Sequence, residues 1–260
     1  MRVARFSTGD ADPRYGIVDG EDLVVLKGHP LVHGYDSTGE RVALDDARLL
    51  APVIPSKVVC VGLNYADHKQ DMEKQGVDDE NDHPLIFLKP NTSIVGPGDP
   101  IRMPQVAGRI THEAELAVVI GRVAKQIDPA KWRDYVFGYT IANDVSARDL
   151  MFADGQWSRA KGYDTFCPIG PWIETDLDPD AGVEIQSYVD GEPRRHGNTA
   201  HMIFGVGAIL AYITDAMTLL PGDVVITGTP SGLGGFTAGQ TVDIDIEGIG
   251  RLSNPAFPRD

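Results

Sequence analysis

The sequence contains little cysteine, little positive charge and no long apolar run. Its two cysteines, Cys60 and Cys167, lie far apart in apolar stretches without CxxC spacing, and no apolar signal segment opens the chain. Disulfides persist mainly in oxidising compartments. We therefore expect reduced, buried thiols in a cytoplasmic protein, and no disulfide framework.

The shortage of basic residues limits the partners of the protein. The chain has 38 Asp and Glu against 23 Lys and Arg, a formal net charge of −15, and no five-residue window is dominated by Lys or Arg. Such a surface would repel nucleic acid. The longest apolar segment, 202–213, is broken by glycines and is shorter than the roughly 20 residues of a membrane-spanning helix. We expect no nucleic-acid or membrane partner, and an acidic substrate would need a local cation to recruit it.

The composition supports one sizeable core. Of the 260 residues, 42% are hydrophobic, and the segments between turns favour strands more often than helices. With 29 glycines and 18 prolines in the turns, we predict a mixed α/β fold that is mainly β and not doubly wound. Pro52 and Pro55 bracket an extended link near residue 54. This link would separate a small β-rich N-terminal domain, residues 1–54, from a larger domain, residues 55–260.

The expected elements place polar residues at the ends of apolar segments. Residues 57–62 predict a buried strand that leads into a helix over 65–75, and Asp128-Pro129 is a typical helix start. The glycine-rich segment 228–235 lacks the GK[ST] ending and the following helix of a phosphate loop, so no nucleotide site is expected there. Further expected elements are a strand at 137–143, a short helix at 146–153, a hairpin turn at Asp190-Gly191, a long helix from about 199 to 219, and strands at 223–227 and 241–246.

Three carboxylates border these apolar segments. On a strand over 112–120, the two-residue period places Glu113 and Glu115 on one face, and both faces continue into apolar residues. Two adjacent buried anions need a cation. Asp144, which follows the apolar run 137–143, offers a third oxygen ligand, and oxygen-only ligation favours Mg²⁺, Mn²⁺ or Ca²⁺ over Zn²⁺. From the pattern alone, a solvent-facing strand and a turn or cap at Asp144 are alternatives.

Two further segments contain candidate proton-transfer groups. His68 and Asp71 are three residues apart on the expected helix, so their side chains can form an imidazole–carboxylate pair able to act as a general base. Lys161 is a cation in a loop between aromatic residues. A solvated helix and an exposed lysine are equally compatible with these patterns, so spacing alone does not decide the roles.

Taken together and in order, these segments resemble the fumarylacetoacetate hydrolase family. The resemblance runs from about residue 50 to the C-terminus, and the ordered set is specific although no single piece is. The matching segments are VGLNYADH at 61–68, FLKP at 87–90, EAELAVVIG at 113–121, NDVSARD at 143–149, KGYDTF at 161–166, PGD at 221–223 and TGTPSG at 227–232.

The resemblance implies a fold and a cofactor. The catalytic domain would be a β-roll, usually dimeric and often preceded by a small N-terminal domain, so we expect a homodimer. One Mg²⁺ or Mn²⁺ per chain would be held by Glu113, Glu115 and Asp144. That ion would chelate the 2-oxo carboxylate end of a small 2-oxo acid substrate.

The resemblance also implies roles for four other side chains. Lys161 would neutralise a developing enolate, while Arg148 and Thr229 would contact the substrate. His68 would be the base, on a helix that closes over the site. The acidic segment 76–84 lacks apolar anchors and borders that helix, so we expect both together to form a mobile lid.

Two departures from the family pattern bear on the reaction. Asp71 stands where members with a helical lid usually have Glu, and Met151 stands where several have a glutamine that contacts substrate or water. Segments 152–157 and 170–176 look most like bacterial oxaloacetate decarboxylases or 2-hydroxyhepta-2,4-diene-1,7-dioate isomerases. We therefore expect a divalent-metal-dependent enzyme that decarboxylates or isomerises small 2-oxo (di)carboxylic acids through a metal-stabilised enolate. Acylpyruvate-type C–C hydrolysis is the alternative, and a non-catalytic metal-stabilised binding module is a distant one.

Overall fold

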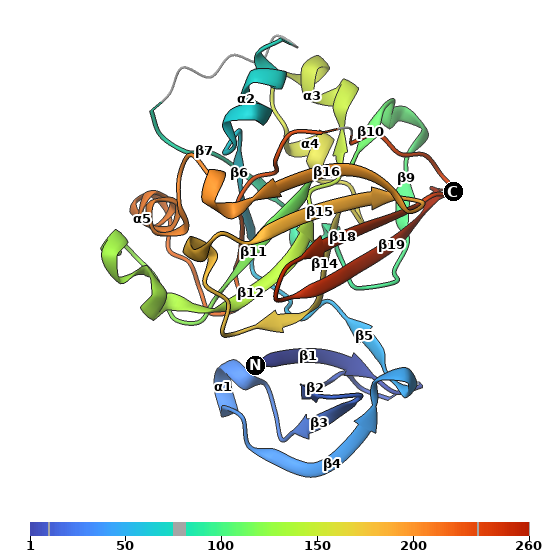
Figure 1. Ribbon diagram of the computed structural model, residues 1–260, viewed down its shortest axis with the longest axis vertical. Coiled ribbons are helices and arrows are strands. Elements are labelled where there is room, and N and C mark those ends of the chain that lie inside the picture. The colour runs from blue at the N-terminus through green and yellow to red at the C-terminus, as the bar shows by residue number, and fades with distance from the viewer. Residues whose placement is uncertain (10, 75–81, 233, 260) are drawn as a thin grey trace.

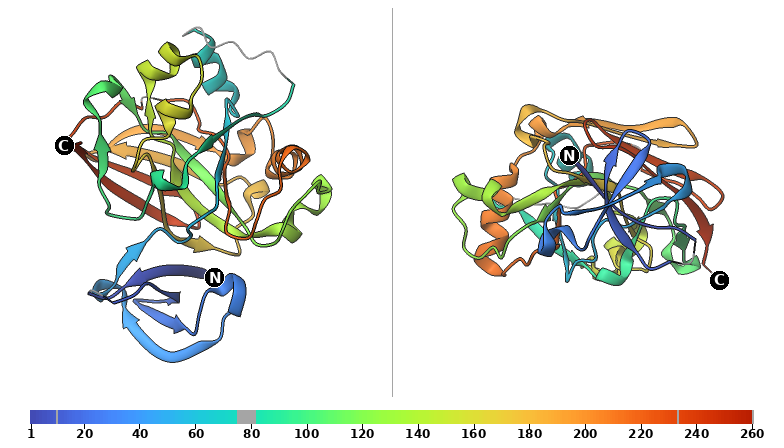
Figure 2. Two further views of the ribbon diagram at one scale, coloured as in Figure 1. Left: turned by 180° about the vertical axis from the view of Figure 1, so that it is seen from behind. Right: turned by 90° about the horizontal axis from the view of Figure 1, so that it is seen from below.

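The computed structural model describes residues 1–9, 11–74, 82–232 and 234–259. A small N-terminal lobe lies at one end of a larger one, and both are built mainly of strands (Figure 1). Seen from behind, the small lobe keeps its place at that end, and seen from below it lies in front of the larger lobe (Figure 2). Among the described helices, none is long and apolar enough to cross a membrane. The fold is mixed α/β and mainly β, as the sequence predicted.

The N-terminal lobe is a curved antiparallel sheet around a small core of its own. Ala4, Phe6, Leu23 and Val25 are buried in it, because alternate residues of each strand face inward. The neighbour order is β4-β3-β2-β1, and β5 pairs with the other edge of β1. The elements are β1 (Arg2–Ser7), β2 (Arg14–Asp19), β3 (Asp22–Leu26), α1 (Pro30–His33), β4 (Ser37–Ala43), η1 (Leu44–Asp46) and β5 (Arg48–Leu50).

The large sheet of the bigger lobe continues into the N-terminal lobe. Arg2 and Val3 of β1 pair with Glu174 and Ile173 of β14, so the two lobes share one sheet of twelve described strands. Its order from β1 onward is β14-β12-β11-β17-β6-β7, with β8 on β14. The strands are β6 (Val58–Gly62), β7 (Leu85–Lys89), β8 (Ile94–Val95), β11 (Ala114–Ile120), β12 (Val136–Asn143), β14 (Cys167–Glu174) and β17 (Val224–Ile226).

A second sheet packs against one face of the large sheet. The order of its five described strands is β16-β15-β18-β19-β9, and the main core lies between the two sheets (Figure 1). Leu116 and Val118 of β11 face this core, while Ala117 and Val119 face a second apolar cluster behind it. Strand β11 is therefore covered on both sides, as predicted. The strands are β9 (Ile101–Met103), β15 (Glu184–Val189), β16 (Glu192–Asn198), β18 (Thr241–Ile246) and β19 (Gly250–Pro258), with a separate pair of β10 (Ile110–Thr111) and β13 (Ser146–Ala147).

The helices lie at the edges of the sheets and differ in two places from the predicted ones. The long helix expected from about 199 to 219 is shorter, because Gly205 has extended backbone angles and caps α5 at its N-terminus. The predicted helix at 146–153 starts later, after a short strand. Strand β19 was not predicted, because its prolines are unusual in a strand. The helices of this lobe are α2 (Ala66–Glu73), α3 (Arg148–Asp154), α4 (Ser158–Lys161), α5 (Val206–Ala216), η2 (Asn91–Ser93), η3 (Gln105–Ala107), η4 (Pro129–Tyr135), η5 (Pro179–Ala181) and η6 (Thr199–His201).

A buried carboxylate joins the starts of two neighbouring strands. Asp223, fully buried, accepts hydrogen bonds from the backbone amides of Ser56 (3.0 Å), Lys57 (3.2 Å) and Leu220 (2.8 Å), and pairs with the Lys57 ammonium. Burial alone would raise the pKa of this carboxyl, but the bonds from Lys57, Ser56 and Leu220 outweigh it and lower the pKa. The ionised group therefore stabilises the parallel pairing of β17 with β6, next to the strand that carries the candidate site.

We predict that Asp223→Asn lowers the free energy of unfolding by about 2–3 kcal/mol, because buried donors lose a charged acceptor. Urea denaturation at pH 7 measures this change. The matched control is Asp245→Asn, which removes a partly exposed pair with Arg251 and should cost less than about 1 kcal/mol. The pKa of Asp223 is lower in the folded protein than in the unfolded chain, where it is about 3.9. Its contribution to the free energy of unfolding is therefore fully present above a pH of about 3.9, and it is lost as the pH falls through the folded-state pKa. Equal losses in the two variants would contradict the prediction.

Candidate metal centre and active site

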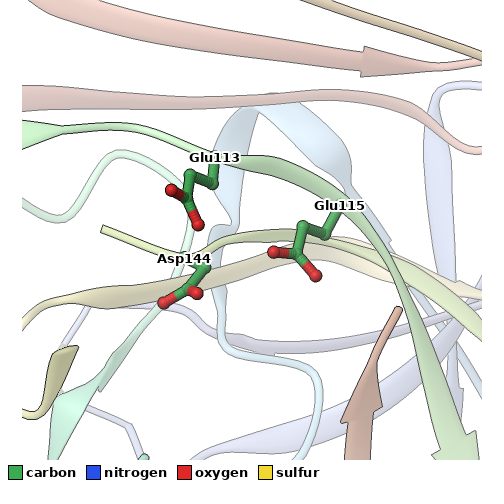
Figure 3. Close-up of side chains that lie close together, drawn as sticks. All are labelled: Glu113, Glu115 and Asp144. Carbon is green, nitrogen blue, oxygen red and sulfur yellow. The ribbon is translucent and has the colours of Figure 1, made fainter. Parts of the chain in front are cut away.

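Three buried carboxylates converge where strands β11 and β12 pair. The antiparallel register sets Glu115 opposite Ala142, and the amide of Asp144 donates a 2.9 Å hydrogen bond to the carbonyl of Glu113. This register carries Glu113, Glu115 and Asp144 to one point, with a ligand oxygen of each within 4.8 Å of the others. Figure 3 shows the three carboxyl groups turned toward one another. The two-residue period and the end of the apolar run left this convergence as one alternative, and the family resemblance implied it.

The donor set fits a hard divalent ion. All three groups are buried, and the pKa of Glu115 is raised well above its usual value by burial, then by the charges of Asp144 and Glu113. Within the described ranges, Glu115 makes no ion pair and accepts only the backbone amide of Gly228. Its charge is therefore poorly compensated, and oxygen-only ligands suit Mg²⁺, Mn²⁺ or Ca²⁺.

Two lysines lie against the carboxylates in the same interior. The Lys161 ammonium donates to Glu113 Oε2 (2.9 Å) and to Asp144, and lies 4.7 Å from the centre of the Phe87 ring. Burial opposes its charge, but Asp144 and Glu113 outweigh burial and raise its pKa, so it stays cationic. Lys89, only 1% exposed, donates to Asp144 Oδ1 at 2.6 Å. Sequence reasoning did not single out Lys89, although a lysine in an otherwise apolar strand was the available signal.

The residues predicted to contact substrate also lie at this site. Arg148, at the start of α3, donates from Nη1 to Glu113 Oε1 at 3.3 Å, and its Nη2 contacts the sulfur of Met72. Burial would raise the pKa of Glu113, but Lys161, His68 and Arg148 outweigh it and lower the pKa. Thr229 is buried and lines the same cavity. These side chains share one enclosure with the carboxylates.

His68 and Asp71 occupy the predicted helix but do not form the predicted pair. His68 is buried and lines the cavity; burial, with the nearby cations of Arg195 and Arg148, lowers its pKa to about 4 against the opposing charge of Glu113. The Asp71 carboxylate instead accepts hydrogen bonds from Ser231 and from Lys74 (3.2 Å). No hydrogen bond joins it to His68 among the described residues, because the short side chain turns to the loop after β17. The predicted hydrogen bond between His68 and Asp71 is therefore not formed among the described residues.

The remaining cavity wall is mostly apolar. The expected lid segment at 76–84 falls largely on residues 75–81, which lie outside the described part of the chain, so the lid stays a prediction. Leu63 has a positive φ of 57° at the junction of β6 and α2, a conformation that costs energy for leucine. Met151, 4% exposed, also lies in this wall. The apolar wall residues are Val61, Leu63, Met72, Phe87, Met151 and Trp157.

Comparison with protein families matches nearly the whole chain. Residues 57–256 match the family model described as "Fumarylacetoacetate (FAA) hydrolase C-terminal". Residues 1–52 match the one described as "Rv2993c-like, N-terminal". The chain is also 41% identical over 290 residues to the mitochondrial oxaloacetate tautomerase fahd2 of Xenopus laevis, covering 98% of this chain and 90% of that protein.

Solved structures of similar sequence share the fold. A 2-hydroxyhepta-2,4-diene-1,7-dioate isomerase from Mycobacterium marinum is 47% identical, with a TM-score of 0.89 over 99% of this chain and 98% of that one. A maleylpyruvate hydrolase from Sphingobium sp. SYK-6, solved with manganese(II) and pyruvate, is 29% identical, with a TM-score of 0.81 over the full length of both chains.

We predict that Mn²⁺ raises the melting temperature of the protein and that Glu115→Gln abolishes this response. At a hundredfold excess over Kd, binding adds about 2.7 kcal/mol, or roughly 5–10 °C for a chain of this size. Glutamine keeps an acceptor for the Gly228 amide and removes a poorly compensated buried charge, so the metal-free variant should melt no lower than the wild type. Thermal melts with and without Mn²⁺ measure both effects.

The control for the metal prediction is Glu184→Gln. This glutamate lies on the surface and bonds Asn198 and His196, so its replacement should leave the Mn²⁺ response intact. If Mn²⁺ raises the melting temperature of Glu115→Gln as much as that of the wild type, the three carboxylates are not the metal site.

Proposed function

This chain belongs to the fumarylacetoacetate hydrolase family, and on that premise we propose that it is a divalent-metal-dependent enzyme that isomerises small 2-oxo acids by proton transfer. The observation that carries the proposal is Lys161, a buried ammonium bonded to two of the three convergent carboxylates. A fixed cation in a dry site stabilises an enolate far better than solvent does. Such a site lowers the barrier between the oxo and enol forms of a 2-oxo acid.

The side chains supply complementary parts of this chemistry. A bound divalent ion would supply Lewis-acid polarisation of the substrate carbonyl. Lys161 faces the same point and offers positive charge to the oxygen on which negative charge grows. His68 is neutral above its pKa of about 4, so its imidazole can accept a proton from carbon and return it. Because the depressed pKa disfavours the imidazolium, His68 would pass the proton on rather than keep it.

Isomerisation is favoured over the other two outcomes that share an enolate. The similar proteins named above include an oxaloacetate tautomerase and a 2-hydroxyhepta-2,4-diene-1,7-dioate isomerase. Hydrolysis needs an oriented water, yet the thioether of Met151 is a weak acceptor, and the Asp71 carboxylate is bonded to Ser231 and Lys74. Decarboxylation is the second candidate, since it needs only the electron sink. The similarity to a maleylpyruvate hydrolase keeps hydrolysis as an outcome to be measured.

We predict that the Mn²⁺-loaded protein interconverts the enol and oxo forms of oxaloacetate faster than it forms pyruvate from oxaloacetate or cleaves acetylpyruvate. Loss of enol absorbance follows the first reaction, and coupled pyruvate detection follows the other two. Lys161→Met should lower kcat by about 10²–10³, because it removes charge stabilisation in the transition state. It should not weaken Mn²⁺ binding, because a competing cation leaves the carboxylates.

The matched control for this test is Arg159→Ala on the same short helix. Arg159 is exposed and paired with Asp154, so its loss should leave kcat within about twofold. Faster cleavage of acetylpyruvate than enol–oxo exchange in the wild type would overturn the isomerase assignment. Unchanged kcat in Lys161→Met would show that Lys161 takes no part in catalysis.

We also propose that the protein is a homodimer. A cleft along β7 and the end of α3 is lined by Leu88 and Phe152, whose exposed fractions are 46% and 41%. Exposed large apolar side chains favour burial against a second copy of the chain. Phe152→Glu should therefore convert the dimer to monomers in light scattering. A mass near 28.1 kDa for the wild type would contradict the proposal.

A further inference from the structure

A second cleft adjoins the metal cavity and is lined by cations. It encloses about 450 Å³ and shares His68 and Arg148 with the metal cavity. Lys74, Arg109 and Arg195 add three more basic groups to its walls, and Asp71, which pairs with Lys74, also lines it. In a protein with a net charge of −15, such a local gathering of positive charge is unusual. It favours an anionic ligand at this place.

Arg195, on β16, is the most buried cation of this cleft. It is 6% exposed, and its Nη1 donates to the carbonyl of Pro230. Its Nη2 packs against Gly234, where an added Cβ would lie only 2.7 Å away. Burial lowers the pKa of the guanidinium, with Glu113 opposing. Within the part of the chain that the structure describes, no carboxylate lies within ion-pair distance of it, so its charge lacks a direct counterion.

Two buried polar atoms of the cleft have no hydrogen-bond partner among the described residues. They are Nε of Arg195 and the hydroxyl of Thr111 on β10, a residue that is 8% exposed. Leaving a buried donor unpaired costs free energy, and native structures rarely do so without a reason. The guanidinium N–H and the threonine O–H can both donate to one carboxylate.

We propose that Arg195 and Thr111 bind the distal carboxylate of a 2-oxo dicarboxylic acid whose 2-oxo acid end lies at Glu113, Glu115 and Asp144. The proposal rests on the function proposed above and narrows its substrate to dianions. His68 and Arg148 line both hollows, so a molecule held at the carboxylates lies directly beside the basic cleft. Where the distal carboxylate is β to the oxo group, the cation of Arg195 would stabilise the charge that loss of CO₂ has to move into the carbon chain, and so would oppose that step. The cleft therefore favours proton transfer over decarboxylation.

Calorimetric titration of the Mn²⁺-loaded protein tests this inference without turnover. The probes are pyruvate, which lacks a distal carboxylate, and 2-oxoglutarate and 2-oxoadipate, which place it at increasing distance. At least one dicarboxylate should bind the wild type about 10- to 100-fold more tightly than pyruvate does. Arg195→Gln should remove that advantage and leave pyruvate affinity within about twofold. Arg195→Lys, which keeps the charge, should restore part of it.

Thr111→Val provides a second reading if Arg195→Gln fails to fold. It should weaken the same dicarboxylate by several fold and leave pyruvate unaffected. No dicarboxylate preference in the wild type, or equal losses for pyruvate and dicarboxylates in both variants, would overturn the inference. Inorganic phosphate that binds as tightly, with the same dependence on Arg195, would overturn it in favour of a free-anion site. If the enzyme assays detect no turnover, the proposed function is overturned. The titration still tests the inference, because it measures binding and does not depend on turnover.

Discussion

Three negative charges held inside a folded core are the constraint around which this molecule is organised. The pairing of β11 with β12 carries Glu113, Glu115 and Asp144 into an interior from which water is largely excluded. Burying uncompensated carboxylates costs several kcal/mol each. The surrounding structure therefore has to supply positive charge and donors, and most of the unusual features of the large lobe do so.

The compensation comes from segments far apart in the chain. Lys89 reaches Asp144 from β7, Lys161 bridges Glu113 and Asp144 from α4, and the amide of Gly228 meets Glu115 from the loop after β17. That loop depends on glycine, because Gly228 has a φ of 96° and a Cβ there would lie 2.7 Å from Asn64. Glu115 nevertheless keeps a raised pKa, because burial and the charges of Asp144 and Glu113 outweigh this compensation.

The basic cleft would supply positive charge to the substrate, as the lysines supply it to the buried carboxylates. A chain of net charge −15 repels dianions at long range, so recognition has to come from a few desolvated cations at short range. Arg148 faces the metal centre, while Arg195 lies in the adjoining cleft without a carboxylate partner among the described residues. Keeping one arginine unpaired destabilises the folded protein, and a carboxylate ligand would offset that cost.

The sequence by itself determined the strand-rich fold and marked the three carboxylates as candidates, because the two-residue period and the ordered motifs are local properties of the chain. It left open whether Lys161 is buried or exposed. The length of α5 and the strand β19 were not predictable, since backbone angles at Gly205 and the pairing of prolines with distant strands are set by tertiary contacts. Only the tertiary structure decided that Asp71 bonds Ser231 instead of His68, that Lys89 pairs with Asp144, and that Arg195 lines the adjoining cleft. These side chains meet their neighbours across more than thirty residues of sequence. Such long-range contacts depend on how sheets and loops pack, which no short pattern encodes.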